Sequence, residues 1–186
     1  MENKYGYLKP YCHYPNFNDD QPMEVLHAPF NIFGPIYADE LEKAEHILQQ
    51  AFPHQLRQFY IEIGSGHLMK VHNALNNEGC RDGNEILPPL VVANFATGKL
   101  RWEGQEYHWM DESTYELMEQ GDLPFFEIGD SSSFLFMKLN SDNPNAVWDY
   151  DLKITDSFEE FVWRLYYESP DFYGQIITDY LESKKK

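Results

Sequence analysis

Apolar residues in the first part of the chain recur at the three- and four-residue spacing of an amphipathic helix. The first such stripe begins at Leu41 and ends near Ala51. Asp39 precedes it and Glu42 follows three residues later, the pattern of a capping box. We therefore expect a helix that begins at Asp39.

Two further helices and a strand are predicted before residue 100. Pro53 favours a helix start, and apolar residues continue at helical spacing through residues 56–63 until the Gly64-Ser65-Gly66 sequence ends them. Residues 68–71 fit a short strand. Pro88 or Pro89 is expected to open a helix that runs to about Phe95 and closes before Gly98.

The second half of the chain is rich in β-forming residues. Three runs, at 125–128, 134–139 and 146–150, alternate with turn-forming residues at 129–130 and 142–145. Short strands joined by tight turns pair with their neighbours in sequence. This pattern predicts an antiparallel meander.

Two helices are expected to close the chain. Ser157 and Glu160 form a capping box before an apolar stripe, and Ser169-Pro170 precedes a last helix. The side chains expected to face inward in that last helix are Phe172, Tyr173, Ile176, Ile177, Tyr180 and Leu181. Helices, then strands, then helices predict an α+β fold and exclude a parallel βαβ arrangement.

The 186 residues fit a single domain that is long enough to bury a substantial core. Residues 1–32 contain several prolines and little periodicity, so we interpret them as an irregular, proline-rich N-terminal arm. The α+β domain then spans 33–186, with an acidic insertion at about 102–120.

Net charge limits the partners that the chain can bind. The formal charge is −17, with 31 Asp and Glu against 14 Lys and Arg, which argues against nucleic acid and anionic membranes. A basic protein would be attracted, although acidity that serves only solubility is an equal alternative. The N-terminal sequence has no secretory pattern, no apolar run spans a membrane, and the two cysteines are too few for a disulfide framework. We expect a cytoplasmic protein.

The segment between Arg101 and Lys138 contains no Lys or Arg and interleaves carboxylates with aromatic rings. Carboxylates pair with basic side chains of a partner, and buried aromatic anchors dominate interface energies. The predicted partner-binding residues are Trp102, Glu103, Glu106, Trp109, Asp111, Glu112, Tyr115, Glu116 and Glu119. The alternative is a solvated helix face whose tryptophans lie in the core.

Catalytic and metal-binding patterns are weak throughout, so we predict no enzyme, no cofactor and no metal site. Cys80 with His67 or His72 would be the best nucleophilic pair, but distance along the sequence cannot establish it. Residues 82–85 carry oxygen ligands without the length of a calcium-binding loop. A cryptic hydrolase is the least favoured interpretation.

Several segments, taken in order, resemble the SUKH superfamily of bacterial toxin-immunity proteins and yeast cell-wall-synthesis regulators. The first is Phe33-Gly34-Pro35 with the helix through Glu45, followed by residues 52–66, which begin Phe-Pro-His and end Gly-Ser-Gly. The later segments are 84–89, 123–130, the strand at 134–139, Val147-Trp148, and 154–161. The arm before Phe33 and the acidic insertion depart from the family pattern.

The resemblance implies a central, mostly antiparallel sheet flanked by helices, and a non-catalytic protein-binding module. For a bacterial member it implies an immunity protein that neutralises a toxin, often a nuclease, here through an acidic surface that faces a basic toxin domain. An intracellular regulator or scaffold is the alternative function. The oligomeric state stays open.

Overall fold

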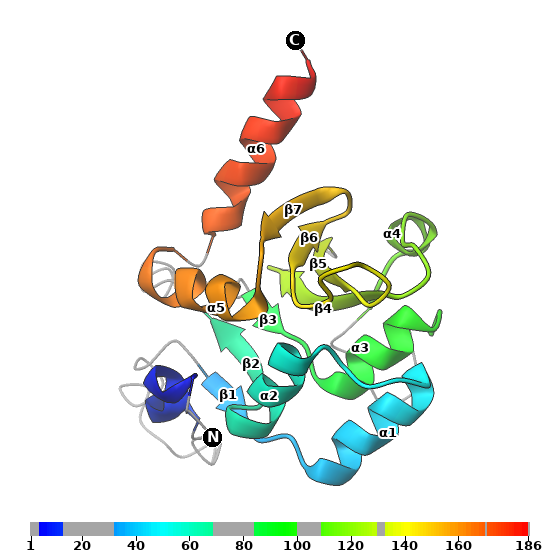
Figure 1. The fold of residues 1–186 in the computed structure, drawn as a ribbon, viewed down its shortest axis with the longest axis vertical. Coiled ribbons are helices and arrows are strands. Elements are labelled where there is room, and N and C mark those ends of the chain that lie inside the picture. The colour runs from blue at the N-terminus through cyan, green and yellow to red at the C-terminus, as the bar shows by residue number, and fades with distance from the viewer. Residues whose placement is uncertain are drawn as a thin grey trace, which may run out of the picture.

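Figure 1 shows the computed structural model of the chain, an antiparallel sheet with helices packed around it. The structure describes residues 4–12, 32–68, 84–99, 109–129, 133–169 and 171–185. The predicted α+β class is confirmed.

The sheet formed by the described residues has seven strands, and each pairs in antiparallel fashion with its neighbour in sequence. The strands are Ile32–Gly34 (β1), Ser65–Leu68 (β2), Asn84–Ile86 (β3), Asp122–Ile128 (β4), Ser133–Lys138 (β5), Val147–Asp149 (β6) and Leu152–Thr155 (β7). The meander predicted for the second half is therefore confirmed, and it extends across the whole sheet.

Helices pack around this sheet (Figure 1). They are a 3₁₀ helix, Gly6–Tyr11 (η1), and the α-helices Ala38–Leu48 (α1), His54–Glu62 (α2), Pro89–Ala96 (α3), Glu112–Glu116 (α4), Phe158–Tyr167 (α5) and Phe172–Lys184 (α6). Helices α1, α2 and α3 group at one end of the molecule, and α6 projects from the other.

A β-bulge in β4 organises the core. The register shifts between Pro124 and Phe126, so that the adjacent residues Phe125 and Phe126 both meet helix α5 instead of pointing to opposite faces. Their ring centroids lie 5.7 and 5.0 Å from that of Phe161, in edge-to-face geometry. The bulge thus joins the centre of the sheet to α5.

Two predicted helix starts are confirmed in detail. Pro89 is the first residue of α3, where its missing N–H leaves no hydrogen bond unmade. The Ser157 hydroxyl oxygen accepts a hydrogen bond from the Glu160 backbone N–H at 3.0 Å, and this bond caps α5. Local sequence was sufficient to predict both helix starts, because each depends only on a residue at the start and on backbone groups within three residues of it.

Three local predictions were wrong. The N-cap of α1 is Tyr37, which makes no side-chain cap, and Asp39 lies inside the helix, where it accepts from Lys43 Nζ at 2.9 Å. Strand β2 begins at Ser65, within the glycine sequence that was expected only to end a helix. Leu181 is 54% exposed because α6 leaves the body of the protein before this residue.

Gly64 shows why the chain can turn so sharply from α2 into β2. Its φ is +110°, and a Cβ atom there would lie 1.8 Å from the carbonyl oxygen of Gly34. Only glycine permits both the dihedral angle and the close approach of β1.

The N-terminal segment of the described chain belongs to the core. Tyr5 and Leu8 are fully buried, and the Tyr5 ring lies 5.1 Å from that of Phe59 and 6.2 Å from that of Phe158. The Tyr5 hydroxyl donates to the carbonyl oxygen of Gln55 at 3.2 Å. Residues 4–12 therefore complete the packing between α2 and α5. The domain boundary at residue 32 stays a prediction.

None of the helices in the described parts of the chain combines the length and the apolar character that crossing a bilayer requires.

Candidate protein-binding surface

Helix α4 is held at its N-terminus by Asp111. The Asp111 carboxylate accepts from the Thr114 backbone N–H at 2.8 Å and from the Thr114 hydroxyl at 3.0 Å, and the Ser113 hydroxyl also donates to it. These hydrogen bonds, that of Ser113 first, hold the pKa of the Asp111 carboxyl below its ordinary value. Asp111 therefore maintains the helix, and its charge stays in place under mildly acidic conditions.

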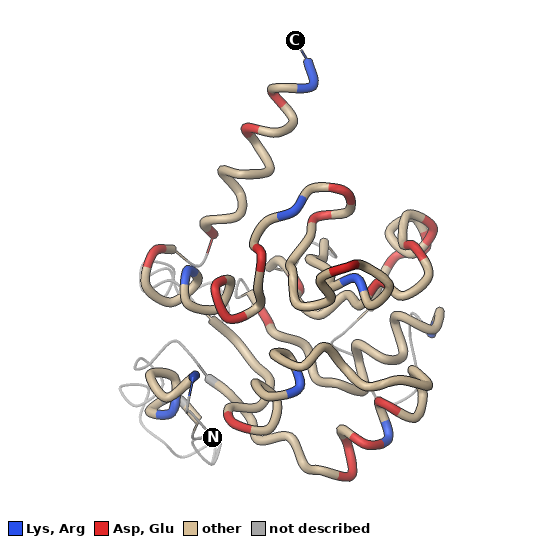
Figure 2. The backbone as a smooth tube through the Cα atoms, in the orientation of Figure 1, with Lys and Arg blue, Asp and Glu red and all other residues tan. Residues whose placement is uncertain are grey.

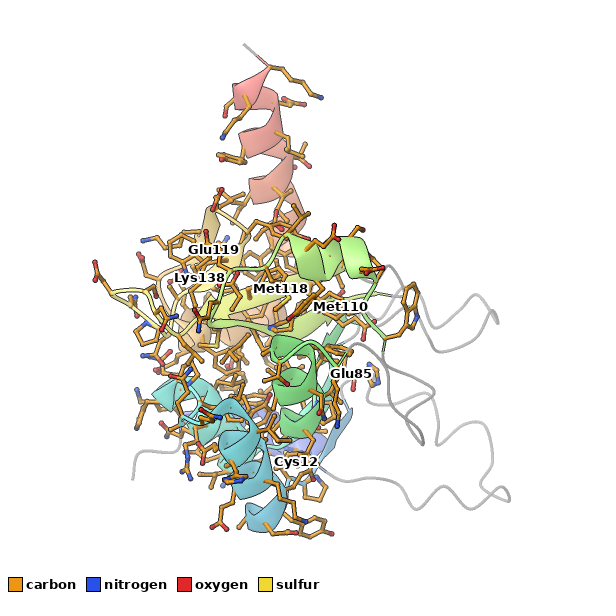
Figure 3. The ribbon with its side chains drawn as sticks, turned by 90° about the vertical axis from the view of Figure 1, so that its right-hand side faces the viewer. Cys12, Glu85, Met110, Met118, Glu119 and Lys138 are labelled. Atoms are coloured by element: carbon orange, nitrogen blue, oxygen red, sulfur yellow. The ribbon has the colours of Figure 1, made fainter. Side chains whose placement is uncertain are left out.

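The inner side of α4 packs on α3 and the sheet. Met110 and Thr114 are 2% and 8% exposed, and Tyr115 packs against the core. A Cβ atom on Gly98 would lie 2.8 Å from the Tyr115 hydroxyl oxygen, so this ring covers the glycine that ends α3. Figure 3 shows Met110 and Met118 between α4 and α3. Tyr115, predicted to contact a partner, thus serves mainly to attach the helix.

The outer side of α4 carries both charged and apolar groups. Glu112 and Glu116 are exposed, and among the residues that the structure describes none forms an ion pair with either. Trp109 is 42% exposed and Leu117 is 64% exposed. A surface with large apolar side chains beside carboxylates can make both apolar contacts and ion pairs with a partner.

Glu119 extends this surface onto the sheet. Its carboxylate lies 3.5 Å from Lys138 Nζ on β5, and Asp151 of the β6–β7 turn lies 4.0 Å from the same nitrogen (Figure 3). The Lys138 side chain is only 15% exposed and also lies 5.8 Å from the Trp148 ring centroid. The largely buried Lys138 therefore lies close to the carboxylates of two exposed residues, Glu119 and Asp151.

Asp122 has a structural role at the start of β4. It is 4% exposed, and its carboxylate accepts from the Glu119 backbone N–H at 3.0 Å. Burial raises the pKa of the Asp122 carboxyl, while this hydrogen bond and the charge of Lys138 lower it in part. The interaction fixes the turn that presents Glu119.

Tyr150 joins the β6–β7 turn to α4. It has a left-handed φ of +48°, and its ring centroid lies 5.2 Å from that of Phe136. Burial raises the pKa of Tyr150, and a side-chain hydrogen bond with Thr114 lowers it in part. Two segments distant in sequence therefore form one edge of the molecule.

We name this edge the α4 surface, defined by Trp109, Glu112, Glu116, Leu117, Glu119 and Asp151. The structure brings together Trp109, Asp111, Glu112, Tyr115, Glu116 and Glu119 of the predicted set, whereas Trp102, Glu103 and Glu106 lie outside the described residues. Sequence reasoning missed Leu117 and Asp151. The position of Asp151 directly after the predicted strand at 146–150 was the available signal.

Acidic residues are not confined to the α4 surface. Figure 2 shows Asp and Glu on α1, α4, α5 and the loops between the strands. Charge alone does not single out one face. The α4 surface adds the exposed Trp109 and Leu117 to its carboxylates, and α5 likewise exposes Trp163 and Tyr167 beside acidic residues.

The catalytic alternatives gain no support from the described residues. Cys12 Sγ lies 3.5 Å from the carbonyl oxygen of Leu8, and burial raises the pKa of its thiol, which disfavours the reactive thiolate. His67 faces Glu85, with 3.7 Å between the imidazole Nε2 and the carboxylate. The described residues contain no group of three or more potential metal ligands. Cys80 and His72 lie outside the described residues.

Comparison with known proteins agrees with this architecture. The family model described as the SMI1 / KNR4 family (SUKH-1) matches residues 35–164. The chain therefore belongs to the SMI1 / KNR4 family (SUKH-1), as its sequence segments predicted. It is 32% identical over 149 residues to the immunity protein YxxD of Bacillus subtilis strain 168, an alignment that covers 80% of this chain and 92% of that protein. No solved structure gives a significant match.

Proposed function

We propose that this chain is an immunity protein that neutralises a toxin by binding it and that catalyses nothing. The observation that carries the proposal is the 32% identity to an immunity protein along 92% of that protein's length. Membership of the SMI1 / KNR4 family supports it. Such a protein would act in the cytoplasm, where it would meet its toxin.

We place toxin binding on the α4 surface. Trp109 and Leu117 would enter pockets on the partner, because large apolar groups in desolvated contacts supply most interface energy. Glu112, Glu116 and Glu119 would pair with Lys and Arg of a basic toxin domain, such as a nuclease whose active site binds phosphates. The segment with Trp102, Glu103 and Glu106 immediately precedes Trp109 and would extend the same contact.

The fixed position of α4 favours this role. Asp111 caps the helix, so the backbone that carries Glu112 and Glu116 loses little conformational freedom on binding. The net charge of −17 would steer a basic partner toward the chain before contact. Neutralisation would follow from steric and electrostatic blocking of the toxin's substrate site.

The test starts from the reading frames beside this gene, and its probe is the C-terminal domain of a large protein where one is encoded there. Titration calorimetry should give tight binding to the parent chain. Trp109→Ala should weaken it about 30-fold, and Glu112→Lys with Glu116→Lys should weaken it at least as much. Glu160→Lys is the matched control, because Glu160 is exposed on α5, across the molecule from α4 in Figure 1.

Three outcomes distinguish the alternatives. Equal losses of affinity for the α4 and α5 variants would contradict binding at the α4 surface but would leave the immunity function supported. A partner that binds yet is harmless to cells would favour the regulator or scaffold function. Protection of cells from the toxin domain without binding to it would refute the binding mechanism.

A further inference from the structure

Helix α6 is firmly attached at one end only. Phe172 and Tyr173 are 9% and 4% exposed, and the Tyr173 hydroxyl donates to Asn84 Oδ1 at 3.0 Å. The Arg164 guanidinium lies 4.1 Å from the Phe172 ring centroid. Beyond this root the helix projects from the body, as Figures 1 and 3 both show. The family match ends at residue 164, before α6 begins.

A strip of small, aliphatic and lysine side chains follows the projecting helix. Gly174, Ile177, Leu181 and Lys184 are spaced by three, four and three residues, the spacing of the contact positions in paired helices. Leu181 is 54% exposed, Ile177 is half-buried because it also packs against the core, and a Cβ atom on Gly174 would meet nothing within 4 Å. The strip therefore has the form of one half of a helix pair.

We propose that α6 pairs with α6 of a second copy of this chain, in antiparallel orientation about a two-fold axis near Thr178. In this arrangement Ile177 of each copy packs beside Leu181 of the other, and the stem of Lys184 crosses the open site at Gly174. Such a contact is isologous and closes as a dimer.

The charges along one flank of the strip select this occupant and this orientation. Asp171 is the N-cap of α6, Lys185 is its C-cap, and Thr178 lies seven residues from each, so their Cα atoms lie along one side of the helix. The Asp171 carboxylate also accepts a hydrogen bond from the Ser169 hydroxyl. An antiparallel pair places Asp171 of each copy opposite Lys185 of the other, with the Thr178 residues facing each other at the axis. A parallel pair would place like charges together. Complementary ends matter here because two chains of charge −17 otherwise repel.

The contact is small, so the dimer should be weak. A helix of 13 residues is about 20 Å long, and two such helices bury less than a standard interface. We expect a dissociation constant of roughly 10–100 µM.

Sedimentation equilibrium of the intact chain tests the proposal. The average mass should rise from that of one chain toward twice that value as concentration increases from about 5 to about 500 µM. Leu181→Glu should weaken association about 100-fold. Gln175→Glu is the control: it adds the same charge at an exposed position on the opposite side of α6. It removes the hydrogen bond to Asp179 and lies four residues from Asp171, so it should weaken association by no more than about threefold. Near-ultraviolet circular dichroism checks that both variants fold.

Charge exchange tests the orientation. Asp171→Lys and Lys185→Glu should each weaken the dimer about tenfold, and the double variant should restore it. A single-chain mass at every concentration, or equal effects of Leu181→Glu and Gln175→Glu, would overturn the proposal. Failure of the double variant to restore association would overturn the antiparallel order. Toxin binding uses α4, so each proposal can fail without the other.

Discussion

At the scale of single residues, a close approach of two backbone segments explains why one position requires glycine. Gly64 lies where α2, β1 and β2 meet, and no side chain fits between its Cα and the Gly34 carbonyl. The turn is therefore determined by one residue.

Gly64→Ala should lower the free energy of unfolding by about 3 kcal/mol or more, because it adds a backbone clash to an unfavourable φ. Gly129→Ala is the control: Gly129 has φ +54° but nothing within 4 Å of the added Cβ, so about 1 kcal/mol is expected. Urea denaturation measures both. Equal losses would show that the dihedral angle, and not the contact with Gly34, sets the requirement.

Asp122 gives a prediction on pH. Its carboxyl pKa is raised on folding, so the folded chain binds this proton more strongly than the unfolded chain. Its contribution to stability is therefore greatest below the unfolded pKa and is lost as pH rises through the folded pKa. Asp122→Asn keeps an oxygen that can accept from the Glu119 N–H and removes the buried charge.

We expect Asp122→Asn to melt at a higher temperature than the parent at pH 7, with the difference disappearing near pH 3. Thermal unfolding followed by circular dichroism across this range measures it. A variant that is less stable at pH 7 would mean that the attraction of Lys138 for the carboxylate outweighs the effect of burial.

At the scale of elements, similar sequence patterns gave different helix starts. Ser157 caps α5 through Glu160 N–H, whereas Asp39 was predicted to cap α1 but lies within it. Ser157→Ala should cost about 1 kcal/mol in unfolding free energy. Asp39→Ala removes only an exposed pair with Lys43 and should cost clearly less than Ser157→Ala. Chemical denaturation of the two variants measures these losses. A larger loss for Asp39→Ala than for Ser157→Ala would contradict the assignment of Ser157, and not Asp39, as a helix cap.

The elements that the sequence predicted are those long enough for their apolar residues to show a helical or strand period. Helices α2, α3 and α5 and strands β4 and β5 have enough apolar residues to show a period, and β6 was located by the run at 146–150, which extends beyond its three residues. Strands β1 and β3 have three residues each, and Asn84–Ile86 contains one apolar residue, so no period exists to detect. Pairing with longer neighbours makes them strands.

The sequence predicted which residue types the candidate site contains, but not which of their side chains face solvent. Sequence located carboxylates and rings around residues 109–119, yet it did not distinguish Tyr115, which packs on Gly98, from Leu117, which faces solvent. The two side chains lie on different sides of a five-residue helix and its C-terminal end, too short a stretch for periodicity to define a face. Only the position of α3 determines which side is inner.

At the scale of the whole molecule, charge acts on stability as well as on binding. The 31 carboxylates outnumber the 14 Lys and Arg by 17, so repulsion among carboxylates exceeds their attraction to these cations. Because acidic residues occur on many elements (Figure 2), this repulsion extends across the surface. Salt should relieve it, since the Debye length falls from about 30 Å at 0.01 M to about 3 Å at 1 M.

We therefore expect the melting temperature at pH 7.5 to rise by about 3 °C between about 0.01 and 0.5 M sodium chloride, as roughly 1 kcal/mol of repulsion is screened. Differential scanning calorimetry at a fixed, low protein concentration measures the rise and limits any contribution from association. The control is the same series near pH 4.6, the isoelectric point, where net repulsion vanishes and salt should have little effect. If stability fell with salt at pH 7.5, the ion pairs of Arg57 with Glu45 and Lys4 with Glu159 would have to outweigh the excess of negative charge. Both pairs are partly exposed and so contribute little, and the excess of carboxylates is the larger effect.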